Sequence, residues 1–266
     1  MQIPVSRTDS QVSEADLALC RATLYNALAL GFRAPTEETL ARLASQDGAG
    51  ALADAAAVVD ANEGLGLAPT VRGLPGKGRI SVTELSASFR RLFGHTAHGP
   101  VPPYETEYGQ EALFQQPQEL ADLTGFYRAF GLTLITGEHE RADHVSCECE
   151  FLSFLALKEA YALEQQDISM LEETRKATRL FLRDHLGRFV PAFTKKLTRE
   201  DRDGFYGTLG ELCWRFTKQE CTRLGISVGP ESLSLRPTTV DSVPMACAGG
   251  TECAMTGESC YPEEAG

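Results

Sequence analysis

Three residues with acid–base chemistry stand close together near the middle of the chain: Asp143, His144 and Glu148. His144 and Glu148 are four residues apart, so they can pair on one face of a helix. Asp143 and His144 fall at the expected start of that helix, where unpaired N–H groups and the positive end of the dipole favour an acidic side chain. Such a cluster is either a recognition site or a polar network that satisfies itself, and residue types alone favour the network.

The eight cysteines are a second set of reactive groups. Five of them fall within helical patterns, where a reduced thiol packs as a small apolar group: Cys20, Cys147, Cys149, Cys213 and Cys221. Cys247, Cys253 and Cys260 follow in a glycine-containing segment, but five and six intervening residues match no standard metal or iron–sulfur site, and a fourth ligand is missing. His95 and His98 are an equally weak ligand pair. We therefore expect no cofactor and no metal.

Composition narrows the classes of partner. The 266-residue chain has a net charge of −12 and an isoelectric point near 4.9, which argues against nucleic acid and suits a basic partner or, more simply, solubility. No apolar run is long enough to insert into a membrane. Residues 1–12 lack the basic and apolar regions of an export signal, so we expect a flexible N-terminus and a cytoplasmic protein.

The elements that position these residues are helical. Apolar residues recur at three- and four-residue steps between recognisable caps. Helices are predicted over residues 13–31, 35–43, 51–61, 81–93, 117–131, 144–163, 167–187, 189–197 and 198–225. No alternating strand pattern is present, so the predicted fold is all-α, a compact single domain of nine or ten helices over residues 13–228. Residues 62–79 are predicted to form an exposed Gly/Pro loop, and residues 229–266 a poorly ordered polar tail that contains cysteines.

The segment His95–Gly109 cannot be a regular helix because of its prolines. Its proline rings and Tyr104 offer a rigid apolar surface, and Glu105 and Glu107 add negative charge beside it. Rings and carboxylates together have the chemistry to hold an apolar peptide that carries arginines.

Four stretches together resemble the TorD/DmsD/NarJ family of cytoplasmic chaperones for molybdoenzyme (DMSO reductase family) maturation. They are Arg21 to Pro35, Phe89 to Thr106, Gly125 to Leu132, and Glu140 to Phe154. Their order and spacing cover about residues 13–225, so the resemblance extends over essentially the whole predicted domain.

The resemblance implies a non-enzymatic chaperone. Family members bind the N-terminal signal or leader segment of the apo catalytic subunit of a molybdenum-cofactor oxidoreductase, and assist folding and cofactor insertion before assembly or export. The implied peptide-binding residues are Pro103, Tyr104, Glu105, Glu140, Asp143 and His144. Ala142 stands where the family motif usually has proline.

Two alternatives remain open at this point. One is a metal- or iron–sulfur-binding protein that uses Cys247, Cys253 and Cys260, and the other is a structural helical adaptor. A substitution separates a recognition role of Asp143 from a structural one. If the carboxylate contacts a peptide, Asp143→Ala weakens binding and barely moves the melting temperature, whereas a structural carboxylate predicts a loss of stability.

Overall fold

The computed structural model describes residues 12–61, 64–75, 80–94, 99–109, 116–135 and 140–236. The chain divides into two units, Met1–Arg236 and Pro237–Gly266, and the second lies outside the described residues. Within the described ranges there are ten α-helices and no strand, only two isolated β-bridges. The predicted all-α fold is therefore confirmed. None of the helices in these ranges has the length and apolar character needed to cross a membrane.

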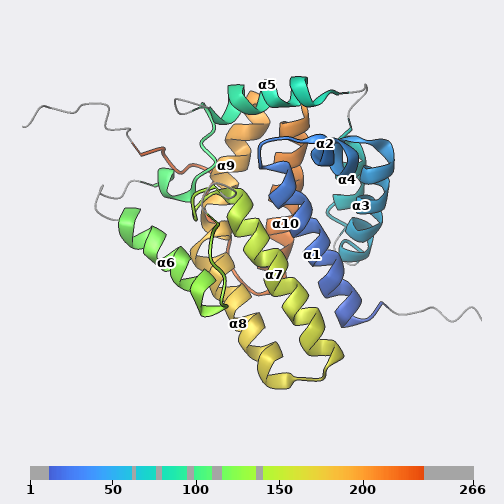
Figure 1. Cartoon of the computed structure of the whole chain (residues 1–266), viewed down its shortest axis with the longest axis vertical. Helices are drawn as coiled ribbons and strands as arrows, with labels where there is room; N and C mark the ends of the chain where they lie inside the picture. Colours follow the sequence, from blue (N-terminus) through green and yellow to red (C-terminus); the bar gives the residue numbers. More distant parts are fainter. Residues whose placement is uncertain are drawn as a thin grey trace, which may run out of the picture. The chain divides into compact units, whose positions relative to one another are not determined.

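The arrangement of the helices is seen in Figure 1. Their bounds are α1 Glu14–Gly31, α2 Glu37–Thr39, α3 Gln46–Val59, α4 Leu67–Gly73, α5 Val82–Phe93, α6 Gln116–Ala129, α7 Val145–Glu164, α8 Ile168–Asp184, α9 Leu186–Glu200 and α10 Phe205–Arg223. A π-helical turn, η1 (Leu40–Ala44), follows α2, and a 3-10 turn, η2 (Glu105–Glu107), follows the prolines. Ser13 and Ser81 form reciprocal capping boxes with Asp16 and Glu84. The Ser81–Glu84 box is the one that the sequence predicts.

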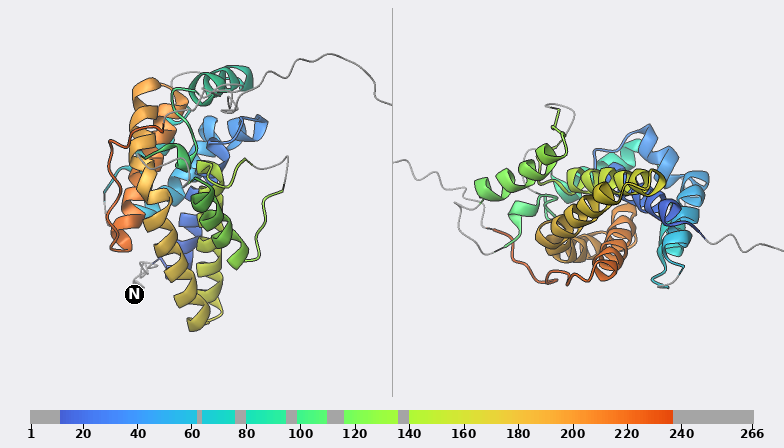
Figure 2. Two further views of the ribbon diagram at one scale, coloured as in Figure 1. Left: turned by 90° about the vertical axis from the view of Figure 1, so that its left-hand side faces the viewer. Right: turned by 90° about the horizontal axis from the view of Figure 1, so that it is seen from below.

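Helix α7 lies at the centre of the first unit. It packs along α1 and against α8, while α9 packs against α10, and α3 and α4 lie on the other side of α1 and α10 (Figures 1 and 2). Apolar side chains of α1 and α7, such as Leu24, Leu28, Leu152 and Leu155, are fully buried. Most residues of α7 are buried against neighbouring helices. The first turn of α7 is therefore held in place, and the proline-rich loop at residues 100–109 packs on it.

Helix α4 corrects the predicted exposed loop over residues 62–79. Leu67 and Val71 of this helix are fully buried, and the Asp60 carboxylate accepts hydrogen bonds from the backbone N–H groups of residues 65–67 at 2.6 to 3.1 Å. Pro69 lies in the first turn, where no helical N–H donor is needed. The glycines lie at the two ends of this short helix and the proline lies in its first turn, so neither residue type prevents the helix.

The boundary between the last two helices also differs from the prediction. Thr198 was expected to start the final helix, but it lies inside α9, and the turn comes at residues 201–204. There the Asp201 carboxylate accepts hydrogen bonds from the N–H groups of Tyr206 and Gly207. A nearby aspartate therefore caps α10 in place of the threonine.

The folded unit extends past the predicted start of the tail at Gly229. The Gly229 N–H donates to the Gly187 carbonyl at 2.9 Å. That carbonyl has no helical donor because the residue four positions on is Pro191, which lies inside α9 without an N–H. Arg236 is also buried, so residues 229–236 belong to the body. The correction follows from backbone pairing, which polar composition does not reveal.

Candidate peptide-binding site over the start of α7

Backbone hydrogen bonds join the proline-rich loop to the start of α7. Tyr104 and His144 form an antiparallel bridge. The Glu105 N–H donates to the Asp143 carbonyl at 2.8 Å, and the Val145 N–H donates to the Pro103 carbonyl at 2.9 Å. The two stretches singled out from the sequence, 40 residues apart, are therefore adjacent.

Asp143 is fully buried and has only internal partners. Its carboxylate accepts hydrogen bonds from the Thr106 hydroxyl at 2.7 Å and the Thr106 N–H at 3.2 Å, and it pairs with Arg141 at 2.5 and 2.9 Å. The Arg141 guanidinium also lies over the Tyr104 ring, 4.4 Å from its centroid. Both carboxylate oxygens are used in these contacts. The Asp143 side chain therefore fixes the position of the loop at Thr106.

Glu105 has the same character at the other end of the loop. It is fully buried, accepts hydrogen bonds from Arg188 at 2.7 and 3.1 Å, and lies 3.1 Å from the His185 ring nitrogen Nδ1. Its partners come from α9 and from the residue between α8 and α9. Glu105 thus ties the loop to a second pair of helices.

His144 caps α7. Its Nδ1 accepts a hydrogen bond from the Ser146 N–H at 3.1 Å and lies 2.7 Å from the Ser146 hydroxyl. Burial lowers the pKa of His144 to about 3, and the charge of Asp143 offsets this only in part, so the imidazole is neutral at neutral pH. The predicted pairing with Glu148 does not form, because Ser146 satisfies the ring nitrogen.

Glu148 is the exception within this buried cluster. Both carboxyl oxygens are inaccessible and have no hydrogen-bond partner among the described residues. Burial raises the pKa of Glu148 well above its ordinary value, and the charges of Glu105 and Asp143 raise it further. The buried environment therefore favours the neutral form of the side chain.

Tyr104 and Glu140 form the outer side of the loop. Both are half-buried, and the Tyr104 hydroxyl donates to the Glu140 carboxylate at 3.3 Å. Burial raises the pKa of Tyr104 to about 12, with a further contribution from the charge of Glu140, so the phenol remains neutral. Of the six residues implied by the resemblance, these two have side chains at the surface, whereas Pro103, Glu105, Asp143 and His144 are buried.

An apolar pocket of about 210 Å³ lies next to this outer side. It is lined by Tyr127, Leu132, Thr133, Leu134, Cys147, Glu150, Phe151 and Phe154. Two contacts connect it to the loop: the Cys147 thiol lies 3.6 Å from the Glu140 carbonyl, and the Tyr127 hydroxyl donates to the Ala142 carbonyl at 2.8 Å.

The apolar surface continues along α7 through Leu157 and Tyr161, which are 50% and 54% exposed. The sequence analysis did not predict this surface, because an aromatic residue such as Phe151 or Phe154 in an apolar helix is expected to be buried in the core. The available signal was the spacing of Phe154, Leu157 and Tyr161, which forms a second stripe beside the first.

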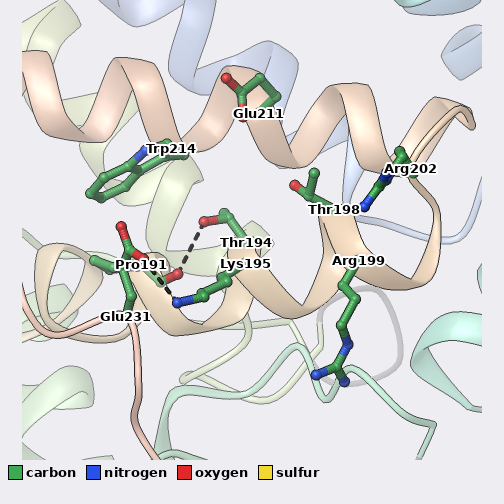
Figure 3. A pocket seen from close by; sticks show the side chains of 9 residues that line it. All are labelled: Pro191, Thr194, Lys195, Thr198, Arg199, Arg202, Glu211, Trp214 and Glu231. Atoms are coloured by element: carbon green, nitrogen blue, oxygen red, sulfur yellow. Dashed lines mark hydrogen bonds and ion pairs between the residues drawn. The ribbon is translucent and has the colours of Figure 1, made fainter.

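A larger pocket, of about 320 Å³, lies between α9 and α10 (Figure 3). It includes Trp214, the single tryptophan of the chain, and is otherwise mainly polar. Lys195 pairs with Glu231 across it at 3.0 Å, and Glu211 pairs with Arg215 at 2.6 Å. It contains none of the predicted site residues, and Lys195 and Glu231 form an ion pair within its lining.

Metal-ligating groups do not gather in the part of the chain that the structure describes: no cluster of three or more His, Cys, Asp or Glu side chains could hold an ion there. The five helical cysteines are free thiols. The candidate ligands Cys247, Cys253, Cys260, His95 and His98 lie outside the described residues.

These observations define the class as an all-helical protein whose proline-rich loop lies on the start of α7, beside an apolar pocket. Residues 38–195, more than half of the chain, match the family model described as nitrate reductase delta subunit. The chain belongs to this family, which confirms the resemblance to the TorD/DmsD/NarJ chaperones.

Several characterised proteins are similar to the chain. The perchlorate reductase assembly chaperone protein of Dechloromonas aromatica is 29% identical over 78% of this chain and 91% of its own length. The chlorate reductase assembly chaperone protein of Ideonella dechloratans is 40% identical over 40% of this chain and 52% of its own. Chaperone protein TorD of Vibrio cholerae is 27% identical over 52% of this chain and 60% of its own. These relatives are assembly chaperones and not catalysts, in agreement with the expected non-enzymatic function.

Proposed function

We propose that this protein is a cytoplasmic assembly chaperone for a molybdoenzyme of the DMSO reductase family. It binds the N-terminal signal or leader segment of the apo catalytic subunit and assists folding and cofactor insertion before assembly or export. Family membership and the assembly-chaperone relatives support the proposal. The observation that carries the peptide-binding part is the apolar pocket beside the Tyr104–Glu140 pair.

The chemistry of this surface matches a peptide with both apolar and basic residues. Apolar side chains that enter the pocket are removed from water, which contributes about 25 cal/mol per Å² of buried apolar area. Glu140 is half-buried, so an arginine that reaches it forms a charge-assisted hydrogen bond stronger than an exposed ion pair. Phe154, Leu157 and Tyr161 extend the apolar contact along α7.

The buried members of the motif have a positioning role in this proposal. The side chains of these residues form their hydrogen bonds within the protein: Glu105 with Arg188, Asp143 with Arg141, and His144 with Ser146. Together with Pro103 they fix the backbone from which Tyr104 and Glu140 face outward. The peptide contacts Tyr104 and Glu140, and the buried residues fix the positions of these two side chains.

A co-purification experiment tests the proposal. The tagged chaperone is mixed with the apo catalytic subunit, either intact or without its N-terminal segment. We expect retention of the intact subunit, loss of the truncated one, and at least tenfold weaker retention by Phe154→Glu, which places a charge at the pocket. Leu19→Glu, at an exposed apolar position on α1, is the matched control and binds normally. Equal retention of intact and truncated subunits would contradict the proposal.

A further inference from the structure

Three arginines from three helices line one cavity of about 220 Å³, which shares no lining residue with the apolar pocket of the proposed peptide-binding surface. They are Arg21 of α1, Arg175 of α8 and Arg223 of α10. Glu159 of α7, Glu14 and Leu17 complete the lining. Glu159 lies near the far end of α7 from His144, so this cavity and the loop site are at different ends of one helix.

Two buried carboxylates hold the arginines in place. Glu159 is 2% exposed and accepts hydrogen bonds from Arg21 at 2.9 Å and Arg175 at 2.8 Å. Glu220 is 1% exposed and accepts two from Arg223, both at 2.9 Å. Burial disfavours the ionised form of Glu159, but the arginines outweigh it and lower its pKa. With Glu14 at the rim, three carboxylates balance the three guanidinium groups, so one positive charge is left when the Glu14 carboxylate is displaced.

The arginines also have unused donors. A guanidinium carries five N–H groups, and the Nη1 nitrogens of Arg21, Arg175 and Arg223 donate to no described residue. Arg21 is 6% exposed, and its buried Nε has no hydrogen bond, since the Glu220 carboxylate oxygen with which it forms an ion pair lies 3.8 Å away. An unpartnered buried donor is costly, so its presence beside a cavity points to a group that accepts from it.

Glu14 indicates which kind of group that is. Its carboxylate lies 2.8 Å from Arg175 Nη2, although the side chain is 69% exposed. An exposed ion pair of this kind is weak and easily replaced. The carboxylate therefore marks a position at the cavity rim where an oxyanion is already accepted and from which it can be displaced.

We propose that the cavity lined by Arg21, Arg175 and Arg223 binds a phosphate group, either free phosphate or the phosphate of a larger molecule whose remainder extends past Glu14. Guanidinium groups present paired N–H donors that match phosphate oxygens. The anion completes the hydrogen bonding of the arginines and joins α1, α8 and α10 to α7. This inference is independent of the proposed peptide binding.

The test is the melting temperature of the whole chain in inorganic phosphate and in sodium chloride of equal ionic strength, at pH 7.5. Phosphate also stabilises proteins through general exclusion from their surface, which does not saturate. We therefore expect a saturable rise above a linear background. Arg175→Gln keeps only the background, whereas Arg183→Gln, an exposed arginine two turns farther along α8, behaves as wild type.

Glu14→Gln provides a second variant with no risk to folding, because the side chain is mostly exposed. Removing the competing carboxylate lowers the phosphate concentration at half-saturation about threefold. Glycerol phosphate distinguishes the sources: a lower half-saturation than free phosphate assigns the site to a phosphate-bearing molecule, and an equal or higher one assigns it to free phosphate. Parallel, non-saturating rises in wild type and Arg175→Gln, or an unchanged half-saturation in Glu14→Gln, would overturn the proposal.

Discussion

Tyr104 and Glu105 are neighbours in the chain, yet they belong to opposite sides of the loop. Tyr104 is half-buried beside Glu140, whereas Glu105 has no exposed surface and is held by Arg188 and His185. The backbone of Tyr104 is extended, and successive side chains of an extended chain point to opposite faces. One short motif therefore supplies both an outer, contacting side and an inner, supporting side, and the two sides predict different consequences of substitution.

The largest effect on stability is expected for the inner side. Glu105→Ala leaves Arg188 without its principal carboxylate and opens a buried space, which should lower the free energy of unfolding by about 3–5 kcal/mol. Urea unfolding measures this, with Glu164→Ala, an exposed position on α7, as the control. A loss of less than about 1 kcal/mol in the free energy of unfolding would contradict the supporting role of Glu105.

The segment at residues 229–236 forms backbone hydrogen bonds with the loop at residues 100–109. Gly109 donates to the Ser234 carbonyl at 2.9 Å, and Arg236 donates to the Glu107 carbonyl at 2.9 Å. A chain that ends at Val228 should therefore be about 2–4 kcal/mol less stable than one that ends at Arg236, because these bonds and the partner of Gly187 are lost. Comparison of the two truncated proteins by chemical denaturation checks the difference. Equal midpoints would show that the segment does not support the loop.

Asp143 is expected to behave as an inner residue. Asp143→Asn keeps the size of the side chain but removes its charge-assisted bonds with Arg141, at a cost of about 1.5–3 kcal/mol. The melting temperature should fall, and the affinity of the remaining folded protein for a leader peptide should stay within about twofold of wild type. A large loss of affinity without a loss of stability would place Asp143 on the outer side.

The pH dependence of stability provides a smaller effect that isolates Glu148. Its folded pKa is raised, so the native state retains a proton that the unfolded chain releases, and stability is lost as pH rises above the unfolded value. His144 has a lowered folded pKa, near 3, and its contribution changes only below the unfolded value of about 6.5. From the unfolded value up to the raised folded pKa, ionisation of Glu148 should therefore lower stability by up to about 1.4 kcal/mol per pH unit.

Glu148→Gln should remove this slope and increase stability at pH 8. Urea midpoints of wild type and variant at pH 7, 7.5 and 8 measure the difference, with Glu164→Gln as the exposed control. Identical slopes in wild type and Glu148→Gln would show that Glu148 is ionised in the native protein.

The sequence predicted the helical fold more completely than it predicted which residues of the motif are exposed and which are buried. Caps such as Ser13, Ser81 and Asp167 act locally, so their side chains and the helices they start can be recognised from the sequence. The helix α4 was hidden because its cap, Asp60, lies several residues upstream and bonds through a turn. Likewise, Pro191 is compatible with α9 only because Gly229, far along the chain, supplies the missing donor.

The site shows the same limit. The motif brought Tyr104, Glu105, Asp143 and His144 together correctly. The partners of Glu105, Arg188 and His185, come from distant positions in the chain, and no spacing rule connects them to the motif. Which side chain of a motif faces inward therefore depends on long-range packing. The apolar pocket was missed for the same reason, since Leu132 and Leu134 reach α7 from a non-helical segment.

Titration calorimetry of a leader peptide against paired variants tests the central claim most directly. The peptide is the N-terminal segment of the client's catalytic subunit, and the variants are the double substitution Tyr104→Ala with Glu140→Gln and the single substitution Asp143→Asn. We predict that the double variant keeps its melting temperature to within a few degrees and loses at least tenfold in affinity, whereas Asp143→Asn melts earlier and binds as wild type at a temperature where it is folded. Wild-type affinity in the double variant would contradict the account.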